Sequence, residues 1–138
     1  MIVLSRAQFD AMVEHAKNIL PNEDCGLLGG TLDGEIRRVE KLYFLENLDA
    51  SPEHFSMDAR EQFAAVKDMR AHGWKLLGNF HSHPSTPSRP SDEDKRLVFD
   101  TTLSYMILSL AEAEPVLNSF RFDRAKNVSR EELKLESD

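Results

Sequence analysis

The hydrophobic pattern of the first twenty residues predicts a strand followed by a helix. Residues 1–4 form a short apolar run, which we interpret as an edge strand. Ser5 stands at the position of a helix N-cap, and Pro21 ends the pattern that follows it. Apolar residues recur at helical spacing between them, at Phe9, Met12, Val13, Ala16, Ile19 and Leu20. This stripe predicts a helix packed against the core.

A β-hairpin is predicted next. Residues 25–31 are small and apolar, and Asp33-Gly34 is a turn sequence of the hairpin type. Residues 35–46 then form the returning strand, although their apolar positions alternate unevenly. We expect a loop over residues 47–52, where polar and turn-forming residues follow the hairpin.

A short strand over residues 54–58 and a second helix are expected after this loop. Asp58, with Glu61 three residues later, is similar to a capping box in which Asp replaces Ser or Thr. Apolar residues then recur at helical spacing, at Ala59, Phe63, Val66 and Met69. The helix is expected to end near Gly73.

The second half of the chain is richer in strands. The pattern predicts one helical segment, over residues 91–100, and three strands, over 74–80, 105–110 and 116–122. The run 105–110 is continuously apolar, as in a central strand covered on both faces. We therefore expect an α/β fold in one domain, over residues 1–126, with an acidic C-terminal tail or edge strand over 127–138.

The composition argues against a nucleic-acid-binding, membrane-spanning or secreted protein. The net charge is 17 − 24 = −7 and no basic cluster is present, which argues against nucleic acid or an anionic membrane as a partner. No apolar run approaches the roughly 20 residues of a spanning helix, and no signal peptide is recognisable. The single cysteine cannot form an internal disulfide, so we expect a cytoplasmic protein.

Two histidines and an aspartate form the candidate metal site. His81 and His83 follow the predicted strand 74–80, and alternate side chains of a strand face the same side. Asp94 follows His83 by eleven residues. Two imidazoles and one carboxylate suit a zinc ion, and three protein ligands leave a fourth position for water, as in catalytic zinc sites. The histidine pair alone would be a weak indication, because many strands carry two histidines near a loop.

Ser91 permits a second interpretation that is compatible with the first. It follows Pro90 and precedes acidic residues, so it is suited to cap the N-terminus of a helix. Such a helix would place Asp94 in its first turn. The proline-rich loop 84–90 is suited to fold that turn back toward the histidines.

The complete pattern resembles the JAMM (MPN-plus) metalloprotease family, in its small stand-alone prokaryotic form. That family pairs an upstream glutamate with His-x-His-Pro and Ser-x-x-Asp, which are here Glu23, residues 81–84 and residues 91–94. Residues 51–58 are also similar, and the resemblance spans about residues 1–122. It implies a curved mixed sheet flanked by about three helices, as in the cytidine-deaminase-like group, although the deaminase ligand pattern is absent.

The resemblance also implies a role for each site residue. One Zn²⁺ would be held by His81, His83 and Asp94. Glu23 would be the general base, and Ser91 would donate a hydrogen bond to the oxyanion of the tetrahedral intermediate. Without the family pattern, Glu23 would be interpreted as an exposed loop acid. A non-catalytic scaffold is the competing interpretation, since many relatives have lost the ligands, but the complete set argues against it.

The implied substrate is a ubiquitin-like sulfur-carrier protein or its conjugates. The short spacing between metal ligands leaves little room for the insertions with which larger relatives grip ubiquitin. The small prokaryotic enzymes are associated with carriers ending in Gly-Gly, which they cut after that tail; a tail without side chains can thread a narrow cleft. The pattern is also compatible with a DNA-repair-associated protein or a cell-wall or phage-type peptidase, but such relatives usually carry an additional region or domain.

The other reactive or polar residues are weaker candidates for a role in the site. Cys25 has no evident base beside it and is expected to be buried in a strand. Asn79 and Ser82 flank the histidines and are candidate hydrogen-bond donors to them. Arg89 is interpreted as a solvated loop charge. The remaining histidines are expected at the surface or at helix ends: His15, His54 and His72.

Overall fold

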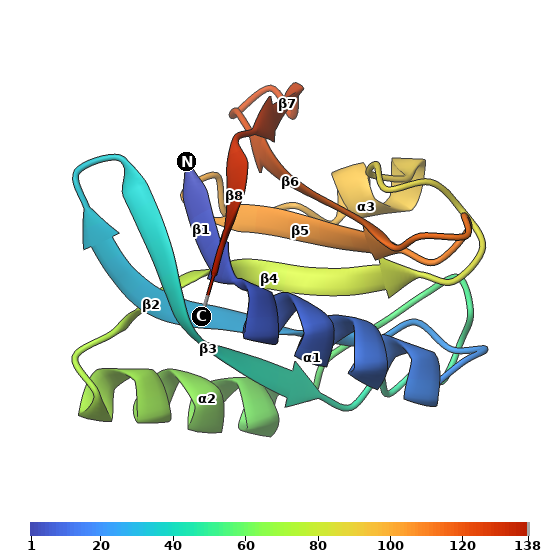
Figure 1. Ribbon diagram of the computed structural model, residues 1–138, viewed down its shortest axis with the longest axis horizontal. Coiled ribbons are helices and arrows are strands. Elements are labelled where there is room, and N and C mark those ends of the chain that lie inside the picture. The colour runs from blue at the N-terminus through green and yellow to red at the C-terminus, as the bar shows by residue number, and fades with distance from the viewer. Residues whose placement is uncertain (138) are drawn as a thin grey trace.

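The computed structural model describes residues 1–137, and Asp138, the last residue of the expected C-terminal segment, lies outside the described residues (Figure 1). The helices are α1 (Arg6–Asn18), α2 (Ala59–Ala71) and α3 (Asp92–Arg96). No helix within residues 1–137 is both long and apolar enough to cross a membrane. The strands are β1 (Ile2–Ser5), β2 (Cys25–Asp33), β3 (Ile36–Leu45), β4 (Lys75–His83), β5 (Ser104–Ser109), β6 (Val116–Phe122), β7 (Val128–Glu131) and β8 (Leu133–Glu136).

All eight strands belong to one mixed sheet, in the order β7-β6-β5-β4-β2-β3-β1-β8. Strand β4 is parallel to β5, and β1 is parallel to both of its neighbours, whereas the other pairs are antiparallel. β7 and β8 form the two edges, yet only Glu132 separates them in the chain. The sheet must therefore curl until its edges approach each other. The expected curved mixed sheet with three helices is confirmed.

The two faces of the sheet are covered by different helices (Figure 1). Phe80 of β4 packs in one buried cluster with Met12 of α1. Met106 of β5 belongs to the same cluster, whereas the next residue, Ile107, packs with Val98, which follows α3. Because successive side chains of a strand point to opposite faces, α1 covers one face and α3 the other.

Helix α2 lies on the face that α3 covers. Met69 of α2 packs on Leu27, whereas the next residue of β2, Leu28, belongs to the α1 cluster. His81 is the register partner of Ile107, and partners in neighbouring strands point to the same face. His81 therefore projects toward α3, where the sequence places the third candidate ligand.

The prediction that residues 1–4 form an edge strand is wrong. β1 pairs with β3 on one side and with β8 on the other. Residues 127–137, interpreted from the sequence as a tail or edge strand, contain both β7 and β8. β8 becomes the outer neighbour of β1, and the pairing depends on contacts between the two ends of the chain that a local pattern does not contain.

Two local predictions near the candidate site are also wrong. Residues 54–58 form no strand, because part of their backbone bonds to the side chain of Asn47 instead of a neighbouring strand. The helix expected over residues 91–100 ends at Arg96. Beyond it, Val98 is drawn into the core against the sheet, which is incompatible with continuing an exposed helix.

Gly26 provides a test of how closely the central strands pack. A β-carbon at Gly26 would lie 2.1 Å from the carbonyl oxygen of Tyr43 and 2.3 Å from the ring of Phe80. Neither the sheet backbone nor the buried ring can move away without cost. Gly26→Ala should therefore lower the free energy of unfolding by about 3 kcal/mol in chemical denaturation. Thr31→Ala, at the exposed end of β2, is the control, and equal stability of the two variants would contradict this packing.

Candidate metal centre and active site

The end of β4 and the start of α3 bring three ligand-type side chains together. Nε2 of His81 lies 3.1 Å from Nε2 of His83, and each nitrogen lies 3.2 Å from Oδ2 of Asp94. Both histidines are buried. Ligand atoms that share a tetrahedral zinc ion lie about 3.3 Å apart, given metal–ligand distances of about 2.0 Å. The three side chains therefore fit a single metal ion.

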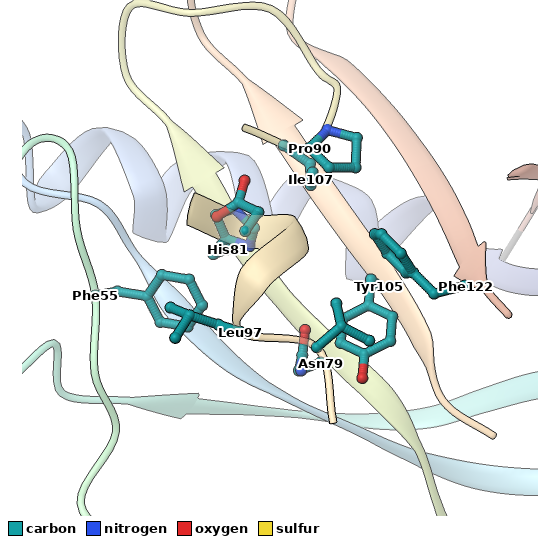
Figure 2. Close-up of a pocket in the computed structure, with 10 residues that line it drawn as sticks. Phe55, Asn79, His81, Pro90, Leu97, Tyr105, Ile107 and Phe122 are labelled. Atoms are coloured by element: carbon teal, nitrogen blue, oxygen red, sulfur yellow. The ribbon is translucent and has the colours of Figure 1, made fainter. Parts of the chain in front are cut away.

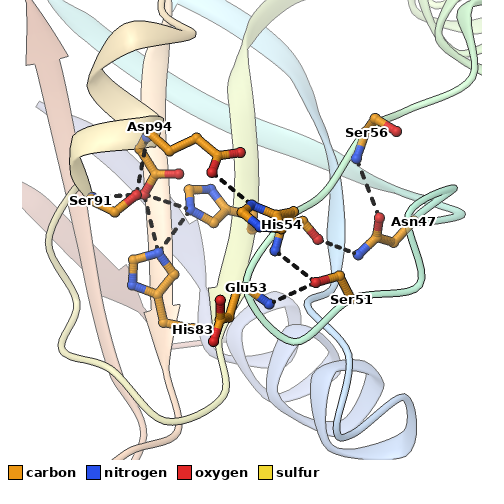
Figure 3. Close-up of polar contacts among 10 residues, drawn as sticks. Asn47, Ser51, Glu53, His54, Ser56, His83, Ser91 and Asp94 are labelled. Atoms are coloured by element: carbon orange, nitrogen blue, oxygen red, sulfur yellow. Dashed lines mark hydrogen bonds and ion pairs between the residues drawn. The ribbon is translucent and has the colours of Figure 1, made fainter.

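A capping box places Asp94 at this position. Ser91 is the N-cap of α3, and its Oγ accepts a hydrogen bond from the Asp94 amide at 3.0 Å. In return, the Ser91 amide donates to Oδ2 of Asp94 at 2.9 Å (Figure 3). This is the same oxygen that faces both histidines, so capping the helix also orients the carboxylate. The capping interpretation is confirmed, and it is compatible with the interpretation of Asp94 as a metal ligand.

The loop after β4 orients His83. Its Nδ1–H donates to the carbonyl of Pro87 at 2.9 Å, which leaves the lone pair of Nε2 directed at the other two ligand-type atoms. The ring of His81 is held differently, by stacking on Phe55 with ring centroids 4.6 Å apart. Within residues 1–137, the buried Nδ1 of His81 has no hydrogen-bond partner. One histidine is thus oriented by a carbonyl and the other by an aromatic ring.

The electrostatics of the cluster favour a cation. Burial alone would raise the pKa of Asp94, but hydrogen bonds from His81 and His83 outweigh it and hold that pKa far below its usual range. Burial would likewise lower the pKa of His83, but its hydrogen bond to Asp94 raises it overall. An ionised carboxylate and two imidazoles that share it are a donor set suited to a divalent metal ion.

Glu23 is buried beside this cluster. It lies just before β2 and is 4% exposed, so it is not the exposed loop acid that its local sequence suggests. Its pKa is raised from 4.5 to about 8, chiefly by burial; the charge of His83 opposes this shift, and the charges of Asp94, Glu93 and Glu53 add to it. A carboxyl with a pKa near neutral pH can both accept and release a proton during turnover.

A small, largely apolar cavity opens beside His81 and Asp94 (Figure 2). Its volume is about 60 Å³. Its walls come from β4, β5, β6 and the segments around α3, and from the loop before α2: Phe55, Asn79, Pro90, Leu97, Val98, Tyr105, Ile107 and Phe122. Asn79, a candidate hydrogen-bond donor to the histidines, instead lines this cavity. A substrate bound at the cluster would meet an apolar wall on this side.

Ser82 points away from the cluster and binds Asp24, the residue before β2. Its Oγ accepts from the Asp24 amide at 2.7 Å, and its own amide donates to the Asp24 carbonyl at 3.0 Å. The Asp24 carboxylate is buried and lies 2.6 Å from Nδ1 of His15 on α1. Ser82 therefore connects β4 to the residue after Glu23 and makes no contact with a ligand-type nitrogen. His15, expected at the surface, anchors this connection.

The remaining candidates do not belong to the cluster of ligand-type side chains. Cys25 is fully buried, and burial with nearby acidic groups raises the pKa of its thiol to about 12, so it is no nucleophile at neutral pH. Nδ1 of His54 lies 2.7 Å from a carboxylate oxygen of Glu93, within hydrogen-bond distance. Arg89 is exposed, as expected. Sequence reasoning missed Asn47 and Phe55, because their contacts with the site arise only when the loop before α2 folds over β4.

The fold and this arrangement of residues define a JAMM-type peptidase, which is a hydrolase. The chain belongs to the prokaryotic homologs of the JAB domain, whose family model matches residues 5–123. The membership inferred from the sequence motifs is thereby confirmed. The match covers β2, β4, α3 and Glu23, so every candidate site residue lies inside it.

Several characterised proteins are similar to this chain. The CysO-cysteine peptidase of Mycobacterium tuberculosis is 28% identical over 109 residues, which cover 79% of this chain and 73% of that protein. The desampylase of Haloferax volcanii is 28% identical over 105 residues, covering 72% and 74%. The tail tip assembly protein K of Escherichia phage N15 is 33% identical over 106 residues, covering 76% of this chain but only 40% of that protein.

Solved structures agree with this assignment. A protein from Desulfitobacterium hafniense with a known solution structure is 59% identical, with a TM-score of 0.92, covering 100% of this chain and 94% of that chain. A JAB1/MPN domain protein from Archaeoglobus fulgidus is 25% identical, with a TM-score of 0.62 and 98% coverage of both chains. The JAB1/MPN fold expected from the sequence is confirmed.

Asp94 gives a direct test of the candidate metal centre. Asp94→Asn removes the carboxylate of the cluster and should weaken zinc binding by more than about 100-fold, since loss of even an outer partner of a ligand costs 10–100-fold. Metal content after dialysis and competition titration with a chelator measure the effect. Asp92→Asn is the matched control, because Asp92 is an exposed aspartate of the same helix. Equal zinc affinity in the two variants would contradict the proposed ligand set.

Glu23 should make the stability of the metal-free protein depend on pH. Because its pKa is raised to about 8, the folded state keeps a proton that the unfolded chain releases above 4.5. The free energy of unfolding therefore falls as the pH rises from about 4.5 to about 8. Glu23→Gln removes the effect and should be more stable than the wild type by about 4 kcal/mol near pH 8, with no such gain near pH 4. Denaturant unfolding at both pH values measures this, and a constant difference would contradict it.

Proposed function

We propose that this protein is a zinc-dependent peptidase or isopeptidase that hydrolyses the bond after the C-terminal Gly-Gly of a ubiquitin-like sulfur-carrier protein. The observation that carries the proposal is the convergence of His81, His83 and Asp94 beside the buried Glu23. The product would be a carrier with a free Gly-Gly end, together with a released amino acid such as cysteine or a deconjugated protein.

The names of two relatives support this substrate class. One is a CysO-cysteine peptidase and the other a desampylase, and each aligns with more than two thirds of this chain. The small cavity beside His81 also favours substrate residues with little side-chain volume next to the cleaved bond. With a net charge of −7 and no basic cluster, nucleic acid and anionic membranes are not the expected partners. We also propose that the reaction takes place in the cytoplasm.

The residues of the site divide the chemistry between them. A zinc ion bound to His81, His83 and Asp94 would supply Lewis-acid activation of a water molecule and of the substrate carbonyl. Glu23 takes the proton from the attacking water and passes it to the leaving amine, for which its raised pKa is suited. Oγ of Ser91 already accepts from the Asp94 amide, so its hydroxyl hydrogen is available to donate to the developing oxyanion.

A carrier with cysteine or a short peptide attached after Gly-Gly provides the functional test. The zinc-loaded wild type should release the attached group after the second glycine, as measured by intact mass. Glu23→Gln should be slower by at least about 100-fold while keeping its zinc, because it loses proton transfer but no metal ligand. Glu40→Gln, which changes an exposed glutamate of β3, is the control and should keep full activity.

The other possible results of this cleavage assay each exclude a specific part of the proposal. Full activity of Glu23→Gln, or loss of its zinc, would contradict the role of Glu23 as general base. Absence of cleavage with zinc bound would exclude this carrier as substrate and direct the search to lysine-linked conjugates or cell-wall peptides. Absence of zinc binding in the wild type would favour a non-catalytic scaffold.

A further inference from the structure

The loop between β3 and α2 crosses the candidate metal centre. We refer to residues 47–57 of this loop as the strap. Phe55 of the strap stacks on His81, with an angle of 23° between the rings. Nδ1 of His54 lies within hydrogen-bond distance, 2.7 Å, of a carboxylate oxygen of Glu93, the residue before Asp94 (Figure 3). The strap therefore touches both elements that carry the metal-ligand candidates.

The side chain of Asn47 holds the strap together. Its Nδ2 donates to the carbonyl of Glu23 at 3.0 Å and to the carbonyl of His54 at 2.9 Å. Its Oδ1 accepts from the amide of Ser56 at 3.3 Å (Figure 3) and from the amide of Asp49 at 3.0 Å. Both amide hydrogens and both oxygen lone pairs are thus engaged. The opposite orientation of the Asn47 amide would lose all four hydrogen bonds, because its nitrogen faces carbonyls and its oxygen faces N–H groups.

The backbone of Glu23 depends on the same strap. Glu23 lies before β2 begins at Cys25, so no strand pairing holds it. Its amide donates to the carbonyl of Ser51 at 2.8 Å, and its carbonyl accepts from Asn47. Both polar groups of the Glu23 backbone are therefore bound by the strap and not by the sheet. These two hydrogen bonds hold Glu23 on the side of the strap, while the bonds between Ser82 and Asp24 hold the next residue to β4.

We propose that Asn47 is a positioning residue, which holds the general base at the metal centre by binding the Glu23 backbone and bracing the strap against it. The proposal rests on the proposed function, in which Glu23 transfers the proton. Asn47 does not touch the substrate or the metal. Its effect arises because proton transfer is steeply sensitive to distance, and a displacement of about 1 Å can cost about 100-fold in rate.

Hydrogen exchange tests the positioning without any substrate. In Asn47→Ala, the Glu23 amide should lose protection from exchange by at least about tenfold. The variant removes the hydrogen bond from Asn47 to the Glu23 carbonyl, so the hydrogen bond from the Glu23 amide to Ser51 should open more often. Ser56→Ala is the matched control, since it removes a strap hydrogen bond to Asp49, at 2.9 Å, that does not involve Glu23. Its Glu23 protection should stay within about twofold of the wild type. Unchanged protection in Asn47→Ala would overturn the proposal.

Steady-state kinetics with the Gly-Gly carrier test the catalytic consequence. Asn47→Ala should lower kcat by about 10- to 100-fold with KM within about twofold and one zinc per chain retained. Asn47→Asp keeps the oxygen that accepts from the strap but cannot donate to the two carbonyls, so it should be impaired to a similar degree. Ser56→Ala should keep the wild-type kcat. A loss confined to KM, or loss of zinc, would overturn the proposal.

Parallel measurement of Glu23→Gln separates the two levels of inference. If Glu23→Gln is inactive while Asn47→Ala keeps full kcat, the positioning role of Asn47 is refuted and the proposed function stands. If Glu23→Gln is fully active, both the base assignment and the role of Asn47 in catalysis are refuted. Impairment of both variants, with zinc retained, supports both.

Discussion

The architecture of the site depends on one carboxylate oxygen. Oδ2 of Asp94 accepts a hydrogen bond from the Ser91 amide and faces the Nε2 atoms of His81 and His83. The capping box that begins a helix of only five residues thus also completes the proposed metal-ligand set. Without it, the short helix would have little to stabilise it, and the two histidines at the end of β4 would share no anion.

The sheet provides the rigid part of the site, and loops provide the rest. The alternation of β4 sends Phe80 and Ser82 toward α1 and the two histidines toward α3, so the core and the site use opposite faces of one strand. Glu23 is brought in from outside the sheet and held by its backbone. Burial of this acid beside Asp94 is unfavourable for its ionised form, which is the property that suits it to proton transfer.

Much of this arrangement could be predicted from the sequence, because its signals are local. His81 and His83 lie two residues apart on one strand, and Ser91 and Asp94 share one helical turn, so spacing alone brings each pair together. The burial of Glu23 and the contacts of Asn47 and Phe55 could not be predicted, because they need the strap to fold over β4. The interior position of β1 depends on its pairing with β8, at the other end of the chain. The early end of α3 depends on the packing of Val98 against the sheet.

X-ray absorption spectroscopy of the zinc-loaded protein tests the central claim most directly, because it reports the donor atoms themselves. The structure predicts a first shell of nitrogen and oxygen atoms at about 2.0–2.1 Å with the signature of two imidazoles and no sulfur. A sulfur scatterer at about 2.3 Å, which only Cys25 or a methionine could supply, would contradict the assignment of His81, His83 and Asp94. A shell containing a single imidazole would contradict it equally.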